Sequence, residues 1–172
     1  GCDSLLPPNA RLDTLQALGD QRGGVLALVD SGAGVQWPMA HLGVDLTSDA
    51  VARPQPDGLP LLPAVQPAAC LLTSGSTGTP QPHAKTWGML NVNVRSEARR
   101  MADHLRLPSL AGLAVVATVP PQHSYGFESS VLLAMLGGAA FECSRPFYPA
   151  DIVKALGSVP APRALVTTPF HL

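Results

Sequence analysis

The chain has 172 residues and a formal net charge of −1, and 46% of its residues are hydrophobic while only 13% are charged. This length is enough for one domain with a buried core, and the composition excludes a disordered, highly charged chain. Because the charge is close to neutral, there is no electrostatic reason to expect a nucleic-acid partner.

The sequence shows neither a targeting segment nor a cysteine pattern typical of a metal or disulfide site. No apolar run reaches the roughly 18–20 residues of a membrane-spanning helix, and the N-terminus lacks a signal-peptide pattern, so we expect no membrane span and a cytoplasmic protein. The three cysteines are far apart and show no CxxC spacing, which disfavours a zinc site or a disulfide framework. The chain begins with Gly1 and stops shortly after Pro169, and we expect it to be a piece of a longer protein.

In the first half of the chain, apolar residues at 12, 15 and 18 predict a helix over 11–18, with Gly19 at its end. The apolar run 25–29 predicts a buried strand. Residues 47–67 are rich in proline and predict a surface connection. A short strand is predicted over 68–73.

The second half alternates strands with helices. The pattern from Trp87 to Leu105 predicts a long helix. Its predicted buried side carries Met89, Val92, Met101 and Leu105. The alternation predicts an α/β fold in which a mainly parallel sheet is flanked by helices, as a single domain over 1–172. The further predicted strands are 113–119, 139–143 and 164–167, and the further predicted helices are 129–136, ended by two glycines, and 150–156.

The strongest functional signal is the stretch Thr73-Ser74-Gly75-Ser76-Thr77-Gly78-Thr79-Pro80, directly after an apolar strand. Glycines let the backbone approach an anion, successive N–H groups can form an anion nest, and hydroxyls can donate to phosphate oxygens. The hydroxyl of Thr77 is also a candidate ligand of a phosphate-bound Mg²⁺. The alternative is a flexible Ser/Gly surface loop. Neither GxxxxGK[ST] nor GxGxxG is present.

A second cluster of residues follows the predicted strand 113–119. Ligands gather at the carboxyl ends of parallel strands in open α/β sheets, so this turn is a candidate substrate site. Its members are His123, Ser124, Tyr125 and Gly126. His123 could hydrogen-bond a carboxylate or flank an aromatic ring, and a structural histidine is the alternative.

The stretch 73–80 closely resembles the signature loop of adenylate-forming (AMP-binding) enzymes, which include acyl- and aryl-CoA ligases, luciferase and peptide-synthetase adenylation domains. Pro121, His123 and Gly126 match that family's second motif, in which the histidine lies beside the acyl pocket. The resemblance covers nearly the whole chain and implies the family's large N-terminal domain. It implies that ATP phosphates are bound by Thr73, Ser74, Gly75, Ser76, Thr77 and Gly78, and the acyl substrate by His123, Ser124, Tyr125 and Gly126.

The loop departs from the family in one respect. The family generally has lysine after Pro80, where this chain has Gln81. Lys85 lies four residues farther on, and in an extended segment residues 81, 83 and 85 share a face. We expect Lys85 to point to the same side without occupying the same place. Two roles therefore stay open for Lys85, a phosphate-binding lysine and a solvated strand lysine.

Within the family, the segments 78–87 and 121–128 look like ligases of bacterial aryl-polyene and xanthomonadin-type pigment clusters. The resemblance implies that ATP and Mg²⁺ activate a carboxylic acid, an aryl acid such as 4-hydroxybenzoate or a fatty acid, to acyl-AMP. The acyl group would pass to an acyl carrier protein or to CoA.

The family's later motifs and its C-terminal lid domain, with the catalytic lysine, would lie beyond Leu172. We therefore expect no certain catalytic residue in the chain and little or no activity from it alone. The alternative is a non-catalytic nucleotide- or acyl-binding module. A hydrolase is disfavoured because no GxSxG nucleophile elbow is present.

Overall fold

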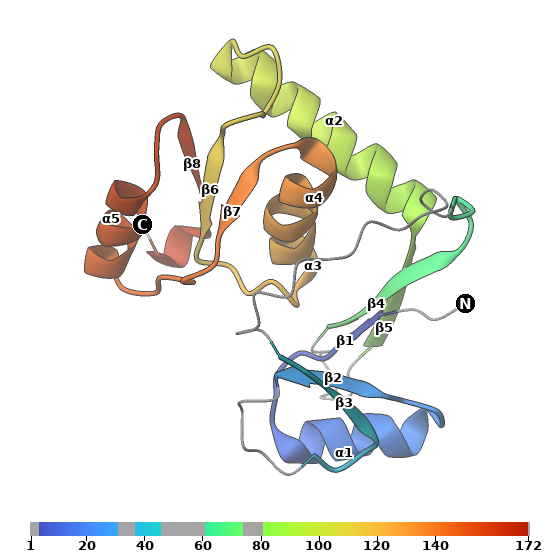
Figure 1. Cartoon of the computed structure of the whole chain (residues 1–172). Coiled ribbons are helices and arrows are strands. Elements are labelled where there is room, and N and C mark those ends of the chain that lie inside the picture. Colours follow the sequence, from blue (N-terminus) through green and yellow to red (C-terminus); the bar gives the residue numbers. More distant parts are fainter. Residues whose placement is uncertain (1–3, 31–36, 46–60, 74–80, 172) are drawn as a thin grey trace. The chain divides into compact units, whose positions relative to one another are not determined.

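The computed structural model describes residues 4–30, 37–45, 61–73 and 81–171. The chain divides into two compact units, one made of Gly1–Pro8 with Leu62–Leu172 and the other of Asn9–Leu61. Among the described residues, each unit contains at least one helix and at least one parallel strand pair (Figure 1). The predicted α/β class with mainly parallel strands is therefore confirmed, while the single domain over 1–172 stays a prediction.

The smaller unit contains helix α1 (Leu12–Gln21) and the parallel pair β2 (Ala27–Asp30) and β3 (His41–Val44). The helix is confirmed, but Gly19 does not end it, because the helix runs on to Gln21. At the start of α1, the Arg11 guanidinium donates to the Asp13 carboxylate, and this bond holds the pKa of Asp13 below its ordinary value.

The strand predicted over 25–29 is β2, but the expectation that it is buried is wrong. Burial alternates along β2, and Leu28 is 71% exposed. A short apolar run fits a strand buried on one face as well as one buried on both, so the run did not decide between them. The strand β3 was not predicted, because His41 and Gly43 interrupt its apolar residues.

In the larger unit, a first sheet has the order β1-β4-β5. The strand β1 (Ser4–Leu6) is parallel and β5 (Gln81–Thr86) antiparallel to the central β4 (Pro67–Thr73). β4 is buried along residues 68–72, as its apolar sequence predicts. Of the predicted surface connection 47–67, residues 47–60 lie outside the described residues, and 61–65 are exposed.

Helix α2 (Trp87–Leu105) has the predicted bounds. It begins after Thr86, whose hydroxyl accepts a hydrogen bond from the Met89 N–H at 3.3 Å and so caps the helix. It ends at Arg106, which adopts a left-handed conformation with φ 56° and donates its N–H to carbonyls of the last turn.

The predicted buried face of α2 is wrong. Met89, Val92 and Leu105 are 50%, 68% and 41% exposed, and only Met101 of the four predicted residues packs against the core. The buried residues repeat every four positions, and two of them are alanines. In the sequence, the larger side chains on the other face gave a stronger apolar signal than these alanines. They are Leu90, Val94, Ala98 and Ala102.

The second sheet of the larger unit has the order β7-β6-β8, with all strands parallel. Its centre is the buried β6 (Ala114–Ala117), between β7 (Ala140–Glu142) and β8 (Arg163–Val166). All three strands were predicted. The connection from β6 to β7 is a continuous helical segment made of α3 (Ser124–Gly126), the π-helical turn η2 (Phe127–Leu132) and α4 (Leu133–Gly137). Helix α5 (Pro149–Ser158) connects β7 to β8, and the short 3-10 helix η3 (Pro169–His171) follows β8.

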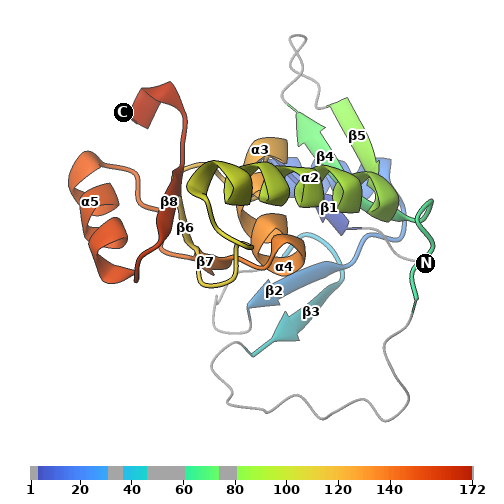
Figure 2. The same cartoon turned by 90° about the horizontal axis from the view of Figure 1, so that it is seen from above.

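The helix predicted over 129–136 thus begins earlier, at Ser124, and ends before Gly138 with its φ of +88°. After β7 the chain turns back across β6 to reach β8. Right-handed crossovers therefore place α4 and α5 on opposite faces of this sheet, as Figures 1 and 2 show.

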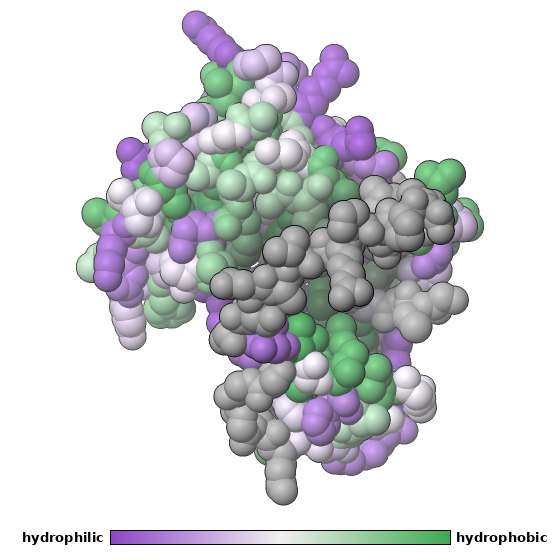
Figure 3. All heavy atoms as spheres, in the orientation of Figure 1, coloured by the Kyte–Doolittle hydropathy of each residue, from purple (hydrophilic) through white to green (hydrophobic). Residues whose placement is uncertain are grey.

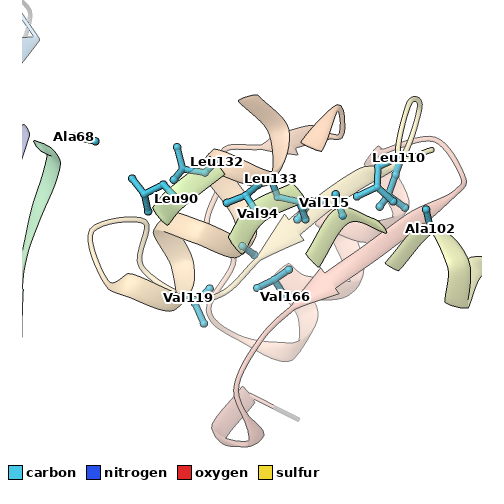
Figure 4. Close-up of a cluster of buried hydrophobic side chains, with 13 residues drawn as sticks. Ala68, Leu90, Val94, Ala102, Leu110, Val115, Val119, Leu132, Leu133 and Val166 are labelled. Atoms are coloured by element: carbon cyan, nitrogen blue, oxygen red, sulfur yellow. The ribbon is translucent and has the colours of Figure 1, made fainter. Parts of the chain in front are cut away.

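The core of the larger unit lies between α2, the helical segment 124–137 and the sheet around β6. Figure 4 shows Val94 of α2 and Leu133 of α4 close to Val115 of β6, and all three are fully buried. Much of the outer side of α2 is hydrophilic (Figure 3), and the helix carries exposed Arg95, Arg99 and Arg100 besides the exposed Met89 and Val92. No helix in the described part of the chain is long and apolar enough to cross a membrane.

Candidate functional site

The Ser/Thr/Gly stretch connects the ends of two paired strands. Thr73, the last residue of β4, pairs with Gln81, the first residue of β5, in an antiparallel ladder. Cross-strand partners have Cα atoms about 4.5–5.5 Å apart, so both ends of the stretch are held at neighbouring positions. Residues 74–80, which include the predicted phosphate ligands Ser74, Gly75, Ser76, Thr77 and Gly78, lie outside the described residues. Their role stays a prediction.

Lys85 stands near the other end of β5, paired in register with Ala69. Its Nζ lies 3.1 Å from Oε1 of Glu128, and the two side chains are only 22% and 14% exposed. The extended segment that the sequence suggested is confirmed as a strand. A freely solvated lysine does not fit this ion pair. The assignment of Lys85 to ATP phosphates stays a prediction.

Glu128 is the member of this cluster that the sequence analysis missed. The hydroxyl of Ser124 donates to Glu128 Oε1 at 3.0 Å, and the amide of Asn93 donates to Glu128 Oε2 at 3.3 Å. The structure therefore brings together Lys85 and Ser124, two predicted site residues, through a carboxylate that the sequence analysis did not assign to the site. The available signal was a lone glutamate within an apolar helical stretch, because a charge in such a place needs partners.

His123 sits directly before α3. Its backbone N–H donates to the Pro120 carbonyl at 3.1 Å, and its carbonyl accepts from the Phe127 N–H at 2.7 Å. Its side chain is exposed and has no hydrogen-bond partner among the described residues. A core histidine with satisfied hydrogen bonds therefore does not fit, while substrate binding by His123 stays a prediction.

The turn that carries His123 is attached to the carboxyl edge of the β7-β6-β8 sheet. The Tyr125 hydroxyl donates to the Thr167 carbonyl at 3.4 Å, just after β8. The hydroxyls of Thr118 and Thr167 lie 2.8 Å apart and link the ends of β6 and β8. The predicted location of the second cluster at the carboxyl end of a parallel strand is thus confirmed, and this is the edge where ligands bind in such sheets.

Position 126 requires glycine for a structural reason that the sequence did not reveal. Its φ of −64° is ordinary right-handed helix, so no unusual backbone conformation requires glycine. A Cβ at this position would instead lie 2.1 Å from the carbonyl oxygen and 2.7 Å from the carbonyl carbon of Pro120. The missing side chain lets α3 pack directly against the strand-end turn. Contact of Gly126 with a substrate stays a prediction.

A polar hollow of about 480 Å³ opens between α2 and the helical segment that starts at Ser124. Glu128 and Ser124 line it on one side, and Asn93, Glu97 and Arg100 line it on the other. Among the described residues, no group of three or more His, Cys, Asp or Glu side chains is placed to hold a metal ion.

Comparison with known proteins found two curated relatives. The chain is 36% identical over 97 residues to a 4-coumarate–CoA ligase of Halorhodospira halophila, a match that covers 56% of this chain and 21% of that protein. It is 36% identical over 104 residues to a 4-coumarate–CoA ligase of Rhodobacter capsulatus, covering 60% and 25%. Both matches support the adenylate-forming, AMP-binding ligase superfamily. The matched parts amount to about a fifth and a quarter of these relatives.

Two further comparisons add little. No family model matches the chain. The structure has a TM-score of 0.45 and 17% identity to a solved structure of McyG A-PCP complexed with phenylalanyl-adenylate, over 83% of this chain and 19% of that one. A structural likeness of this size does not decide the relationship, which rests on the two sequence matches.

Proposed function

We propose that this chain supplies the phosphate- and acyl-binding part of a ligase that activates a carboxylic acid with MgATP. The observation that carries the proposal is the Thr73–Pro80 sequence, which joins the paired residues Thr73 of β4 and Gln81 of β5. It is supported by the 36% identity to two ligases and by the exposed His123 at the carboxyl edge of a parallel sheet.

The proposed reaction has two steps. A carboxylate oxygen attacks the α-phosphorus of ATP, the bond to the bridging oxygen breaks, and pyrophosphate leaves with that oxygen. A thiolate then attacks the acyl carbon and AMP leaves. In the first step the protein positions the reactants and stabilises charge on the departing pyrophosphate.

Residues of both predicted clusters have roles in this scheme. Backbone N–H groups of Gly75 and Gly78 and the hydroxyls of Thr73, Ser74, Ser76 and Thr77 would hold the β- and γ-phosphates. Mg²⁺ would neutralise phosphate charge, with the Thr77 hydroxyl as a protein ligand. His123, with Ser124 and Tyr125 of α3 beside it, would place the acid.

The substrate class is the finer part of the proposal. The segments 78–87 and 121–128 resemble ligases that load an acyl or hydroxybenzoyl group onto a carrier protein, and the two curated relatives are named for 4-coumarate and CoA. An aryl acid such as a hydroxybenzoate is the first candidate and a fatty acid the second. An acyl carrier protein and CoA are both candidate acceptors.

Exchange of labelled pyrophosphate into ATP tests the proposal. The protein at its natural full length and the 172-residue chain are each assayed with a panel of aryl and fatty acids. We expect acid-dependent exchange from the full-length protein and little from the chain alone. ATP binding without exchange in either form would instead identify a non-catalytic binding module, and exchange without added acid would exclude the proposed first step.

A further inference from the structure

We propose that Glu128 is a positioning residue that fixes the His123 turn, and that Lys85 acts through Glu128 rather than on the phosphates of ATP. The inference rests on the proposed function and adds one assignment to it. Three side chains on three elements converge on this one carboxylate: Lys85 of β5, Asn93 of α2 and Ser124 of α3.

The bond from Ser124 explains how Glu128 reaches the candidate acid site. Ser124 is the first residue of α3 and directly follows His123. The Ser124 hydroxyl donates to the Glu128 carboxylate at 3.0 Å, so Glu128 fixes the first turn of α3. This in turn fixes the backbone position of His123, from which its side chain extends. On the other side, the Tyr125 hydroxyl holds α3 to the end of β8. The turn is thus fixed from two directions.

The geometry of β5 separates Lys85 from the Ser/Thr/Gly stretch. Gln81 is the strand residue next to that stretch, and at about 3.3 Å per residue Lys85 lies roughly 13 Å farther along the strand. Its ammonium is paired with Glu128 at 3.1 Å. The positive charge of Lys85 is therefore balanced locally, away from Thr73 and Gln81, the described strand residues that border that stretch.

The surroundings of Glu128 favour a specific role. The Glu128 and Lys85 side chains are 14% and 22% exposed, so water screens their attraction little, and removing one partner leaves the other charge poorly solvated. Glu128 also lies in the π-helical turn η2, a rare backbone form that is frequent at functional sites.

Four variants of the full-length protein test the inference in the exchange assay: Glu128→Gln, Lys85→Met, the double variant, and the charge swap Lys85→Glu with Glu128→Lys. We expect each single variant to raise the KM for the acid by roughly 5- to 30-fold, the range of one lost charged contact, and to leave the KM for ATP nearly unchanged. The double variant should be no worse than either single variant, and the charge swap should recover part of the loss.

Asp103→Asn on α2 and Lys154→Met on α5 make the same kinds of chemical change at exposed positions outside this cluster and outside the hollow, and should behave as wild type. Ser124→Ala removes only the hydroxyl that links the start of α3 to Glu128. This variant replaces Glu128→Gln as the test if Glu128→Gln does not fold. Its expected effect is the same selective rise in the KM for the acid.

A rise in the KM for ATP on Lys85→Met, with none on Glu128→Gln, would assign Lys85 to the phosphates and overturn the inference. Glu128→Gln and Ser124→Ala variants that match Asp103→Asn would overturn it while leaving the proposed function intact. A wild-type protein without exchange on any acid would overturn the proposed function, and this inference with it.

Discussion

Replacing Gly126 with alanine tests how the candidate site is built. The Cβ of Gly126→Ala would lie 2.1 Å from the Pro120 carbonyl oxygen, 1.3 Å short of an ordinary contact at 3.4 Å. The three nearest atoms are all backbone, since Val119 O also lies 3.2 Å away, so no flexible side chain can move aside. Either α3 or the strand-end turn must shift. Overpacking of this kind costs about 1–3 kcal/mol of unfolding free energy, and occasionally more.

The measurement is a pair of thermal and denaturant melts with a matched control. For a chain of this size the expected fall in Tm is roughly 2–12 °C, at about 2–4 °C per kcal/mol. Gly157→Ala in α5 makes the same change where nothing lies within 4 Å, and helix propensity should there raise stability by about 0.5–1 kcal/mol. The two variants should therefore move in opposite directions. If Gly126→Ala melts with or above wild type, the close packing of α3 on the Pro120 carbonyl is not a constraint.

Three further predictions address the proposed ligands. Calorimetric titration of the 172-residue chain should detect ATP and pyrophosphate but not adenosine, and adenosine binding as tightly as ATP would show that phosphates are not the anchor. Thr77→Val in the full-length protein should slow exchange by the equivalent of about 1.5–3 kcal/mol with an unchanged Tm, and a normal rate would remove Thr77 from the site. His123→Ala should weaken the apparent affinity for the acid by roughly 2- to 150-fold and spare ATP. Equal losses for both substrates with a lower Tm would assign His123 a structural role.

The elements with strong local signals could be predicted from the sequence. Helix α2 was placed between its observed ends because its sequence is long enough to show a helical pattern. In the structure, the Thr86 cap fixes its start. The strand β6 was found because a run of apolar residues without a helical period fits a strand buried on both faces. The position of His123 followed from β6, since the carboxyl end of a parallel strand leads directly into the turn.

The face that α2 buries could not be predicted, because it depends on what lies opposite. Ala98 and Ala102 are buried where the helix packs closely, while the more hydrophobic Met89 and Val92 face outward. Judged by side-chain hydrophobicity alone, the sequence favoured the wrong face of α2 as the buried one. The strand β3 was missed for a related reason, since its pairing with β2 supplies what its short sequence does not show.

Glu128 shows where the motif-based interpretation of the candidate site stops. The motifs single out residues by type and spacing along the chain. Glu128, in the helical turn η2, instead contacts Asn93, 35 residues away, and Lys85 on the strand β5. A carboxylate in an apolar helical stretch does indicate that partners exist, because an unpaired charge there would lose its hydration. The sequence does not say which partners. Lys85 and Ser124 entered the prediction as separate ligands of two different substrates, and their shared bond to Glu128 makes them one unit whose members must be varied together.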